Sequence, residues 1–217
     1  MNKNNIDKFS FILGLFASDG NLDNSRVRFF CSEEEISFFK LILMPMIEKV
    51  FNVKPTFRYY NIRCYLLAIN STKVEKIFRS IFQYKGPKKF NLKIPNVDFN
   101  VYSFISGLIA GDGSITIAKK NNYPILQFVN SSEVLINFFS NFLKKNRINY
   151  YEYKRKDDSY LILIRGRELR KFLSLVPLLN PVQESKLKVF EKYGYLSPWT
   201  TYKERLKMLD ATVVQPG

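Results

Sequence analysis

Two aspartates occupy matching positions in this 217-residue chain, and their shared context predicts chemistry at an acidic site. Asp19 ends the apolar segment 12–20, and Asp112 ends the similar segment 105–113, 93 positions further along. Each segment is rich in small residues, has the character of a helix and finishes in Asp-Gly. A carboxylate at a helix C-terminus lies against the negative end of the helix dipole, where a cation is favoured. We therefore expect both acidic groups to be held there for function.

Small residues at matching positions of the two segments predict that the helices pack together. Positions i, i+3 and i+4 share one face of a helix, and Gly inside a helix costs about 0.5–1 kcal/mol relative to Ala. Close approach of two backbones offsets this cost. These residues form one small-residue stripe on each helix: Gly14, Ala17 and Ser18 in the first segment, and Gly107, Ala110 and Gly111 in the second. The large residues Leu13, Leu15, Phe16, Leu108 and Ile109 then enter the core of each half.

Stripe-on-stripe packing would bring Asp19 and Asp112 side by side at one end of the helix pair. Two carboxylates a few ångströms apart repel each other, so one takes up a proton or both share a cation. Mg²⁺ prefers oxygen ligands, keeps several waters and bridges to phosphate oxygens. The pair therefore favours metal-assisted hydrolysis of a phosphodiester.

The charge of the chain indicates a polyanionic partner, of which nucleic acid is the commonest. Lys and Arg outnumber Asp and Glu by 34 to 19, which gives a net charge of +15, and 16% of the residues are aromatic. The absence of His excludes His-based catalysis and His metal sites. Cys31 and Cys64 are isolated, so neither a zinc cluster nor a disulfide framework is expected. No apolar run is long enough for a membrane span, and we expect an intracellular protein of the cytoplasm or an organelle matrix.

The similarity between the two halves extends beyond the acidic segments. Segment 64–78 matches 159–173 at an offset of 95, and 30–34 matches 129–133 at an offset of 99. Drifting offsets indicate loops of different length around equivalent elements. The fold class is therefore α+β, with the order αββαββα occurring twice.

The expected elements follow from caps, alternation and turn residues. Helices are expected from Asp7 to Gly20 and from Asn100 to Gly113, each starting at a cap and ending at a glycine able to adopt the left-handed conformation. The further expectations are strands 26–31, 115–119 and 125–129; helices 33–50 (kinked at Pro45) and 133–145; hairpins 56–60 with 62–69 and 150–156 with 160–164; and helices 72–82 and 167–175. We expect the first repeat over 1–84, a linker over 85–99, the second repeat over 100–195 and a tail over 196–217, for which the sequence offers no account.

Residues 6 to 195 resemble the LAGLIDADG homing endonucleases of the single-chain, two-motif type, through both acidic segments and the internal duplication. The resemblance implies two four-stranded antiparallel sheets forming a saddle over DNA, with the motif helices at the centre. It also implies a monomer with an internal pseudo-dimer that cleaves both strands of double-stranded DNA across the minor groove. Mg²⁺ is the implied cofactor; we expect Mn²⁺ to substitute for it and Ca²⁺ to bind without supporting cleavage.

Site residues are carried over position by position from this resemblance. Asp19 and Asp112 match the acidic metal ligands, joined by the main-chain carbonyls of Ser18 and Gly111. The polar residue after the second strand, commonly Gln, falls at Asn130, which can orient a metal-bound water, and at Cys31, which departs from the pattern. The catalytic basic residue of the second repeat matches Lys186. Its counterpart in the first repeat is Lys88, Lys89 or Lys93.

Alternating strand residues predict the surface that contacts DNA, because successive side chains point to opposite faces. Arg can read guanine and Gln can read adenine in the major groove, whereas other contacts go to phosphates. Neutralising about 8 phosphates would give a slope of log K against log[salt] near roughly −7. The candidate residues are Arg26, Arg28, Arg58, Tyr60, Arg63, Lys119, Lys120, Gln127, Lys154, Arg155 and Lys156.

Two other functions fit the same fold. One is an RNA-binding intron maturase; the other is a catalytically inactive DNA-binding regulator. Retention of both Asp19 and Asp112 favours the nuclease, because a regulator would be expected to lose the acidic pair.

Overall fold

Both halves of the chain contain the order αββαββα, as the duplication predicts, and the second half adds two further helices at its end. The computed structural model describes residues 3–23, 25–83, 92–118 and 123–211. The first half contains α1 (Lys3–Asp19), β1 (Asn21–Asp23), β2 (Arg26–Ser32), η1 (Glu33–Glu35), α2 (Ile36–Phe38), η2 (Phe39–Leu43), α3 (Met44–Phe51), β3 (Thr56–Asn61), β4 (Cys64–Asn70) and α4 (Thr72–Ile81). The second half contains α6 (Val101–Asp112), β5 (Gly113–Ile117), β6 (Pro124–Asn130), α7 (Glu133–Lys145), β7 (Tyr151–Lys154), β8 (Tyr160–Arg165), α8 (Gly166–Leu175), α9 (Pro181–Tyr193) and α10 (Tyr202–Asp210). No helix among these residues has the length and apolarity needed to cross a lipid bilayer.

Each half forms a four-stranded antiparallel sheet, and the two sheets have the same topology. The strand orders are β1-β2-β4-β3 and β5-β6-β8-β7. Phe29 pairs with Leu67 in the first sheet, and Phe128 pairs with Ile162 in the second. These pairs are related by offsets of 99 and 95, the values found in the sequence. The α+β fold class and its repeated unit are therefore confirmed.

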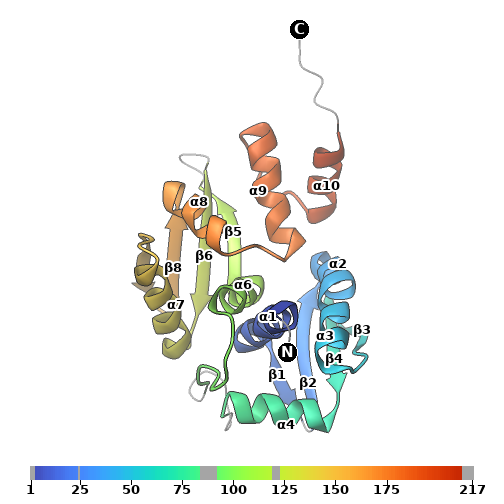
Figure 1. Ribbon diagram of the computed structural model, residues 1–217. Coiled ribbons are helices and arrows are strands. Elements are labelled where there is room, and N and C mark those ends of the chain that lie inside the picture. The colour runs from blue at the N-terminus through green and yellow to red at the C-terminus, as the bar shows by residue number, and fades with distance from the viewer. Residues whose placement is uncertain (1–2, 24, 84–91, 119–122, 212–217) are drawn as a thin grey trace.

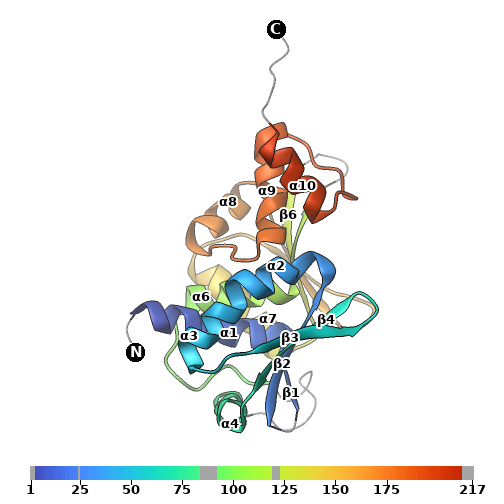
Figure 2. The same cartoon turned by 90° about the vertical axis from the view of Figure 1, so that its right-hand side faces the viewer.

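Helices α1 and α6 lie side by side at the centre of the molecule, between the two sheets (Figure 1). Their large side chains, Leu13, Leu15, Phe16, Leu108 and Ile109, are all buried in the core. Phe16 shows how each helix anchors its own half, because its ring contacts those of Phe29, Phe78 and Phe82. Helices α9 and α10 pack against each other at one end of the molecule, well away from α4 (Figure 2).

The starts of the two central helices differ from each other. Asn100 caps α6 as predicted, because its Oδ1 accepts hydrogen bonds from the amides of Tyr102 and Ser103. Asp7 is not a cap, since α1 begins four residues earlier, at Lys3. Its Oδ1 instead accepts a hydrogen bond from Asn100 Nδ2 at 2.8 Å. The expected cap of the first helix therefore links it to the start of the second.

The glycines that follow the two aspartates are not left-handed, contrary to expectation. Gly113 is extended, with φ −85° and ψ 150°, and Gly20 does not have a positive φ either. A Cβ at Gly20 would lie 2.1 Å from the Phe16 ring, and one at Gly113 would lie 2.4 Å from the Ile109 carbonyl oxygen. These positions need glycine because the chain turns directly from helix into strand where there is no room for a side chain.

The helical stretch after β2 is irregular just before Pro45, the residue at which the sequence predicts a kink. It starts as the 3-10 turn η1 and continues through the π-helix η2 before α3. Pro45 has no amide hydrogen with which to continue an α-helical ladder. The wider turn, in which the Met44 amide donates to the Phe39 carbonyl, precedes it.

Candidate active site and nucleic-acid interface

The backbones of α1 and α6 touch where the small residues meet. A Cβ built on Gly14 would lie 2.0 Å from the Phe104 carbonyl oxygen, and one on Gly107 would lie 2.1 Å from the Phe11 carbonyl oxygen. Each obstacle is backbone of the facing helix, so rotation of a side chain cannot relieve it. The small-residue stripes therefore pack on each other in the symmetric manner that the sequence predicts.

The same packing brings the two acidic ends together. A Cβ on Gly111 would lie 2.1 Å from Ser18 Oγ and 3.0 Å from Asp19 Oδ2. The carboxylate of Asp19 thus reaches the residue immediately before Asp112. Asp19 is exposed and Asp112 is half-buried, so solvent reaches both side chains.

Asp112 lies in a cavity of about 340 Å³ between the helix ends and the second sheet. Asn130, at the end of β6, donates a hydrogen bond from Nδ2 to Asp112 Oδ2. Its Oδ1 accepts a hydrogen bond from the Ser132 amide at 2.7 Å, which fixes the side-chain orientation. The structure therefore brings together two residues, Asp112 and Asn130, that the sequence placed 18 positions apart. The cavity is lined by Ala17, Ser18, Leu92, Asp112, Val129, Asn130, Ser131, Ser132, Arg155, Asp157 and Ser159.

Cys31 occupies the equivalent position in the first half but cannot act as Asn130 does. Cys31 pairs with Tyr65 in the register of the first sheet, and Asn130 pairs with Tyr160 in that of the second. The Cys31 side chain is only 5% exposed and belongs to the hydrophobic core. Burial, helped by the negative charge of Glu35, raises the pKa of its thiol to about 12. The two halves of the site consequently differ in chemistry at this position.

The donor atoms at the acidic ends fit a hard divalent cation. Ser18 and Gly111 each directly precede the last residue of a central helix, so their main-chain oxygens lie at the C-terminal ends beside the aspartates. The Ser18 hydroxyl donates back to the Leu15 carbonyl at 3.0 Å, so its main-chain oxygen, rather than its hydroxyl, is the candidate ligand. The described residues contain no group of three or more His, Cys, Asp or Glu side chains suited to a metal. A cation here would use two carboxylates, carbonyls and water, as Mg²⁺ does.

Of the predicted catalytic lysines that the structure describes, neither Lys186 nor Lys93 lines the Asp112 cavity. Lys186 is half-buried on α9, where desolvation and the charge of Arg205 lower its pKa, while Glu34 and Glu35 act in the opposite direction. Lys93 donates to Gln83 Oε1 at 2.8 Å. Lys88 and Lys89 lie outside the described residues. The basic side chain that does line the cavity is Arg155, which the sequence assigned to DNA contact.

Basic and aromatic side chains cover the outer face of the first sheet, as alternation along β2 predicts. Val27, Phe29 and Cys31 are buried, whereas Arg26 and Arg28 point to the other face. Both arginines form ion pairs with Asp23, at 3.3 and 3.2 Å. The rings of Phe30 and Tyr60 meet on this face at 5.2 Å, and Arg58 shares the face with Tyr60. Arg63 lies apart, because it adopts φ 59° at the hairpin turn and lines a groove next to Tyr202.

The second sheet has an equivalent outer face, but only part of the predicted set lies on it. Gln127 is on this face, opposite Ser114 and Leu163, while its neighbours Leu126 and Phe128 are buried. Lys154 faces the helices instead, where it lies beside Tyr160 and Asp158. Strand β7 ends at Lys154, so Arg155 and Lys156 belong to the turn. Lys119 and Lys120 lie outside the described residues.

Three residues on this outer face were missed by the sequence reasoning. Tyr151 and Tyr153 are 45% and 50% exposed, and the Arg165 guanidinium lies 4.2 Å from the centre of the Tyr151 ring. The register of β7 with β8 places both tyrosines on the side of Gln127. The alternating tyrosines of segment 151–154 indicate this face in the sequence, but the prediction was based on Lys154 and Lys156 instead.

Comparison with known proteins identifies the domain and the fold. Residues 100–177 match the family described as LAGLIDADG-like domain. No curated protein matches the sequence. Mesophilic variants of the homing endonuclease I-DmoI are 17% identical, with a TM-score of 0.59 over 80% of this chain and 92% of theirs. I-DmoI in complex with DNA and Mn is 19% identical, with a TM-score of 0.57 over 80% of this chain and 97% of that one.

The K262A mutant of I-SmaMI is 9% identical, with a TM-score of 0.57 over 92% of this chain and 96% of that one. The N-terminal LAGLIDADG domain of DUF199/WhiA is 16% identical, with a TM-score of 0.55 over 80% and 82%. At these identities the likeness concerns the fold. Residues 100–177 are therefore a LAGLIDADG-like domain, and the chain as a whole has the fold of the single-chain, two-motif homing endonucleases I-DmoI and I-SmaMI.

Proposed function

We propose that this protein is a site-specific DNA endonuclease of intron homing, which hydrolyses both strands with divalent cations held by Asp19 and Asp112. The observation that carries the proposal is the approach of Asp19 Oδ2 to Gly111, the residue that precedes Asp112, at the ends of two helices that lie between the two sheets. A cation bound there would activate water and stabilise the leaving oxygen of a phosphodiester. I-DmoI has been solved in complex with DNA and Mn and with DNA and Ca, and its G20S variant with target DNA in the presence of Mg, which supports the choice of a divalent cation for this chain.

The residues around Asp112 supply the rest of the proposed centre. Asn130 holds the Asp112 carboxylate through its amide and is positioned to orient a water. Arg155 lines the same cavity and offers a positive charge to a phosphate entering it. Lys186 is the proposed basic residue of the second half, and Lys88, Lys89 or Lys93 is that of the first. Each would offset the negative charge that develops on the phosphate.

The outer faces of the two sheets are the proposed DNA-reading surface. Arg26, Arg28, Arg58 and Tyr60 serve the first half, and Gln127 serves the second. The net charge of +15 would draw the polyanion to these faces. The solved complexes of I-DmoI with DNA support this choice of partner.

The decisive experiment is cleavage of a duplex that spans the uninterrupted locus into which the coding sequence inserts. We expect cutting of both strands in Mg²⁺ and binding without cutting in Ca²⁺. Asp19→Asn and Asp112→Asn should each abolish double-strand cutting, whereas the control Asp98→Asn, at an exposed position, should cut both strands as the wild type does. Double-strand cleavage that persists in either active-site variant refutes the proposed site. Binding to intron RNA but not to this duplex refutes the nuclease and supports a splicing cofactor.

A further inference from the structure

Helix α9 begins against the end of the central helix α6. Asn180, only 1% exposed, caps α9 by accepting a hydrogen bond from the Val182 amide at 3.0 Å. Its Nδ2 donates to the Ala110 carbonyl at 3.4 Å, two residues before Asp112, and to Glu35 Oε1 of the first half at 3.2 Å. One buried amide thus contacts both halves beside the acidic site.

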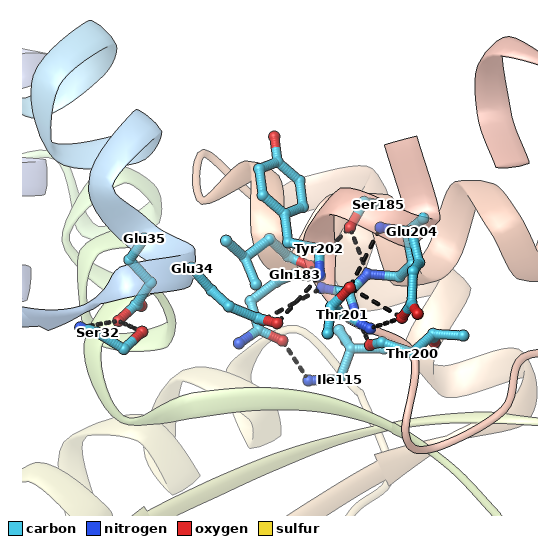
Figure 3. A network of polar contacts seen from close by, with 12 residues as sticks. Ser32, Glu34, Glu35, Ile115, Gln183, Ser185, Thr200, Thr201, Tyr202 and Glu204 are labelled. Carbon is cyan, nitrogen blue, oxygen red and sulfur yellow. Dashed lines mark hydrogen bonds and ion pairs between the residues drawn. The ribbon is translucent and has the colours of Figure 1, made fainter. Parts of the chain in front are cut away.

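Gln183, one turn further along α9, holds the chain on the other side of Asp112. Its Oε1 accepts a hydrogen bond from the Ile115 amide at 2.7 Å, and its Nε2 donates to the Gly113 carbonyl at 3.4 Å. Figure 3 shows Gln183 reaching from α9 to Ile115. Asn180 and Gln183 therefore bracket Asp112, contacting the backbone two residues before it and one to three residues after it.

A buried arginine fixes the place of α9 itself. Arg205 on α10 is 2% exposed and donates from Nε to Ser185 Oγ at 2.8 Å. Its guanidinium also pairs with Glu34 of the first half at 3.7 Å, and Glu34 Oε1 accepts a hydrogen bond from the Tyr202 amide at 3.0 Å. Figure 3 shows Glu34 pointing into this network, with Tyr202 and Ser185 around it. Glu34 and Glu35, just after β2, thereby tie α9 and α10 of the second half to the first half.

We propose that Gln183, supported by Asn180, is a positioning residue for Asp112 and sets cleavage of one DNA strand. The inference depends on the proposed function. The turn from α6 into β5 is tight, because Gly113 has no room for a Cβ. Rotation of this turn would therefore move the Asp112 carboxylate relative to Asp19. The hydrogen bonds of Gln183 hold the turn, and both of them go to the second half alone.

The test is Gln183→Met, which keeps the length of the side chain and removes both hydrogen bonds. The control is Glu191→Met, at an exposed position of the same helix. Each strand of the target duplex carries its own label, and single-turnover cleavage in Mg²⁺ is followed for both. Loss of a hydrogen bond of ordinary strength predicts that the single-turnover rate of cutting one strand falls by about fivefold to tenfold. We expect less than a twofold change in the other strand and in DNA affinity in Ca²⁺. Equal slowing of both strands, or no slowing, overturns the inference.

A second measurement does not depend on cleavage. Exchange of the Ile115 amide hydrogen is compared between wild type and Gln183→Met, together with Mn²⁺-induced broadening of the Gly111–Ser114 amide signals. We expect faster exchange and an altered broadening pattern in the variant, and neither in Glu191→Met. Unchanged exchange and broadening overturn the inference. A wild-type protein that binds Mn²⁺ there but cuts no duplex would refute the proposed function, while this comparison still decides the role of Gln183.

Discussion

Gly107→Ala gives the sharpest test of how closely the two central helices pack. The new Cβ would lie 2.1 Å from the Phe11 carbonyl oxygen and 2.7 Å from the Leu15 amide nitrogen. Because an ordinary contact requires at least 3.4 Å, the helices must separate by about 1.3 Å. Overpacking of this kind costs about 3 kcal/mol where only backbone can yield, and the better helix propensity of Ala returns about 1 kcal/mol.

We therefore expect Gly107→Ala to lower the free energy of unfolding by about 2 kcal/mol, and the melting temperature by about 4–8 °C for a domain of this size. Urea unfolding followed by circular dichroism measures the first quantity, and a thermal scan measures the second. Val101→Ala, at an exposed position of the same helix and off the face that carries Gly107, is the control and should not lose stability. If cleavage occurs as proposed, it should fall by about 100-fold, since a shift of about 1 Å at reacting groups has that effect. A variant as stable as the wild type would refute the packing argument.

Three further predictions concern the site and its surroundings. Gly111→Ala should destabilise the protein because its Cβ would meet Ser18 Oγ at 2.1 Å; adding Ser18→Gly should recover much of the loss, so strictly additive unfolding energies in a double-mutant cycle would contradict the contact. Burial raises the pKa of Cys31 to about 12, so a thiol reagent at pH 8 should modify Cys31 only on unfolding, after the half-buried Cys64; equally fast reaction of both thiols would contradict this. Desolvation lowers the pKa of Lys186 in the folded state, so between that pKa and 10.5 the unfolded state binds more protons and stability rises with pH; Lys186→Met should lack this rise in urea unfolding from pH 7 to 10, and an equal rise in the variant would be evidence against it.

The sequence alone determined the repeat, the order of the elements and the small-residue contact. These features are local or periodic: an Asn that caps a helix, a strand that alternates Arg with Val and Phe, and small residues at i, i+3 and i+4 where two helices must touch. Each leaves a signal at a fixed spacing in the chain. Asp19 and Asp112 can therefore be paired from the sequence alone, because their helices carry matching small-residue stripes.

The tertiary structure decided which side chains share a space with the acids. Lys154 and Arg155 are neighbours in sequence, yet one faces the helices and the other lines the Asp112 cavity, because β7 ends at Lys154 and Arg155 belongs to the turn that follows. Gln183 left no signal, since its partners are backbone atoms 68 to 70 positions away, which any sequence could supply. Spacing along the chain encodes the elements and the faces they bury. Contacts between a side chain and a distant backbone become visible only once the helices have packed.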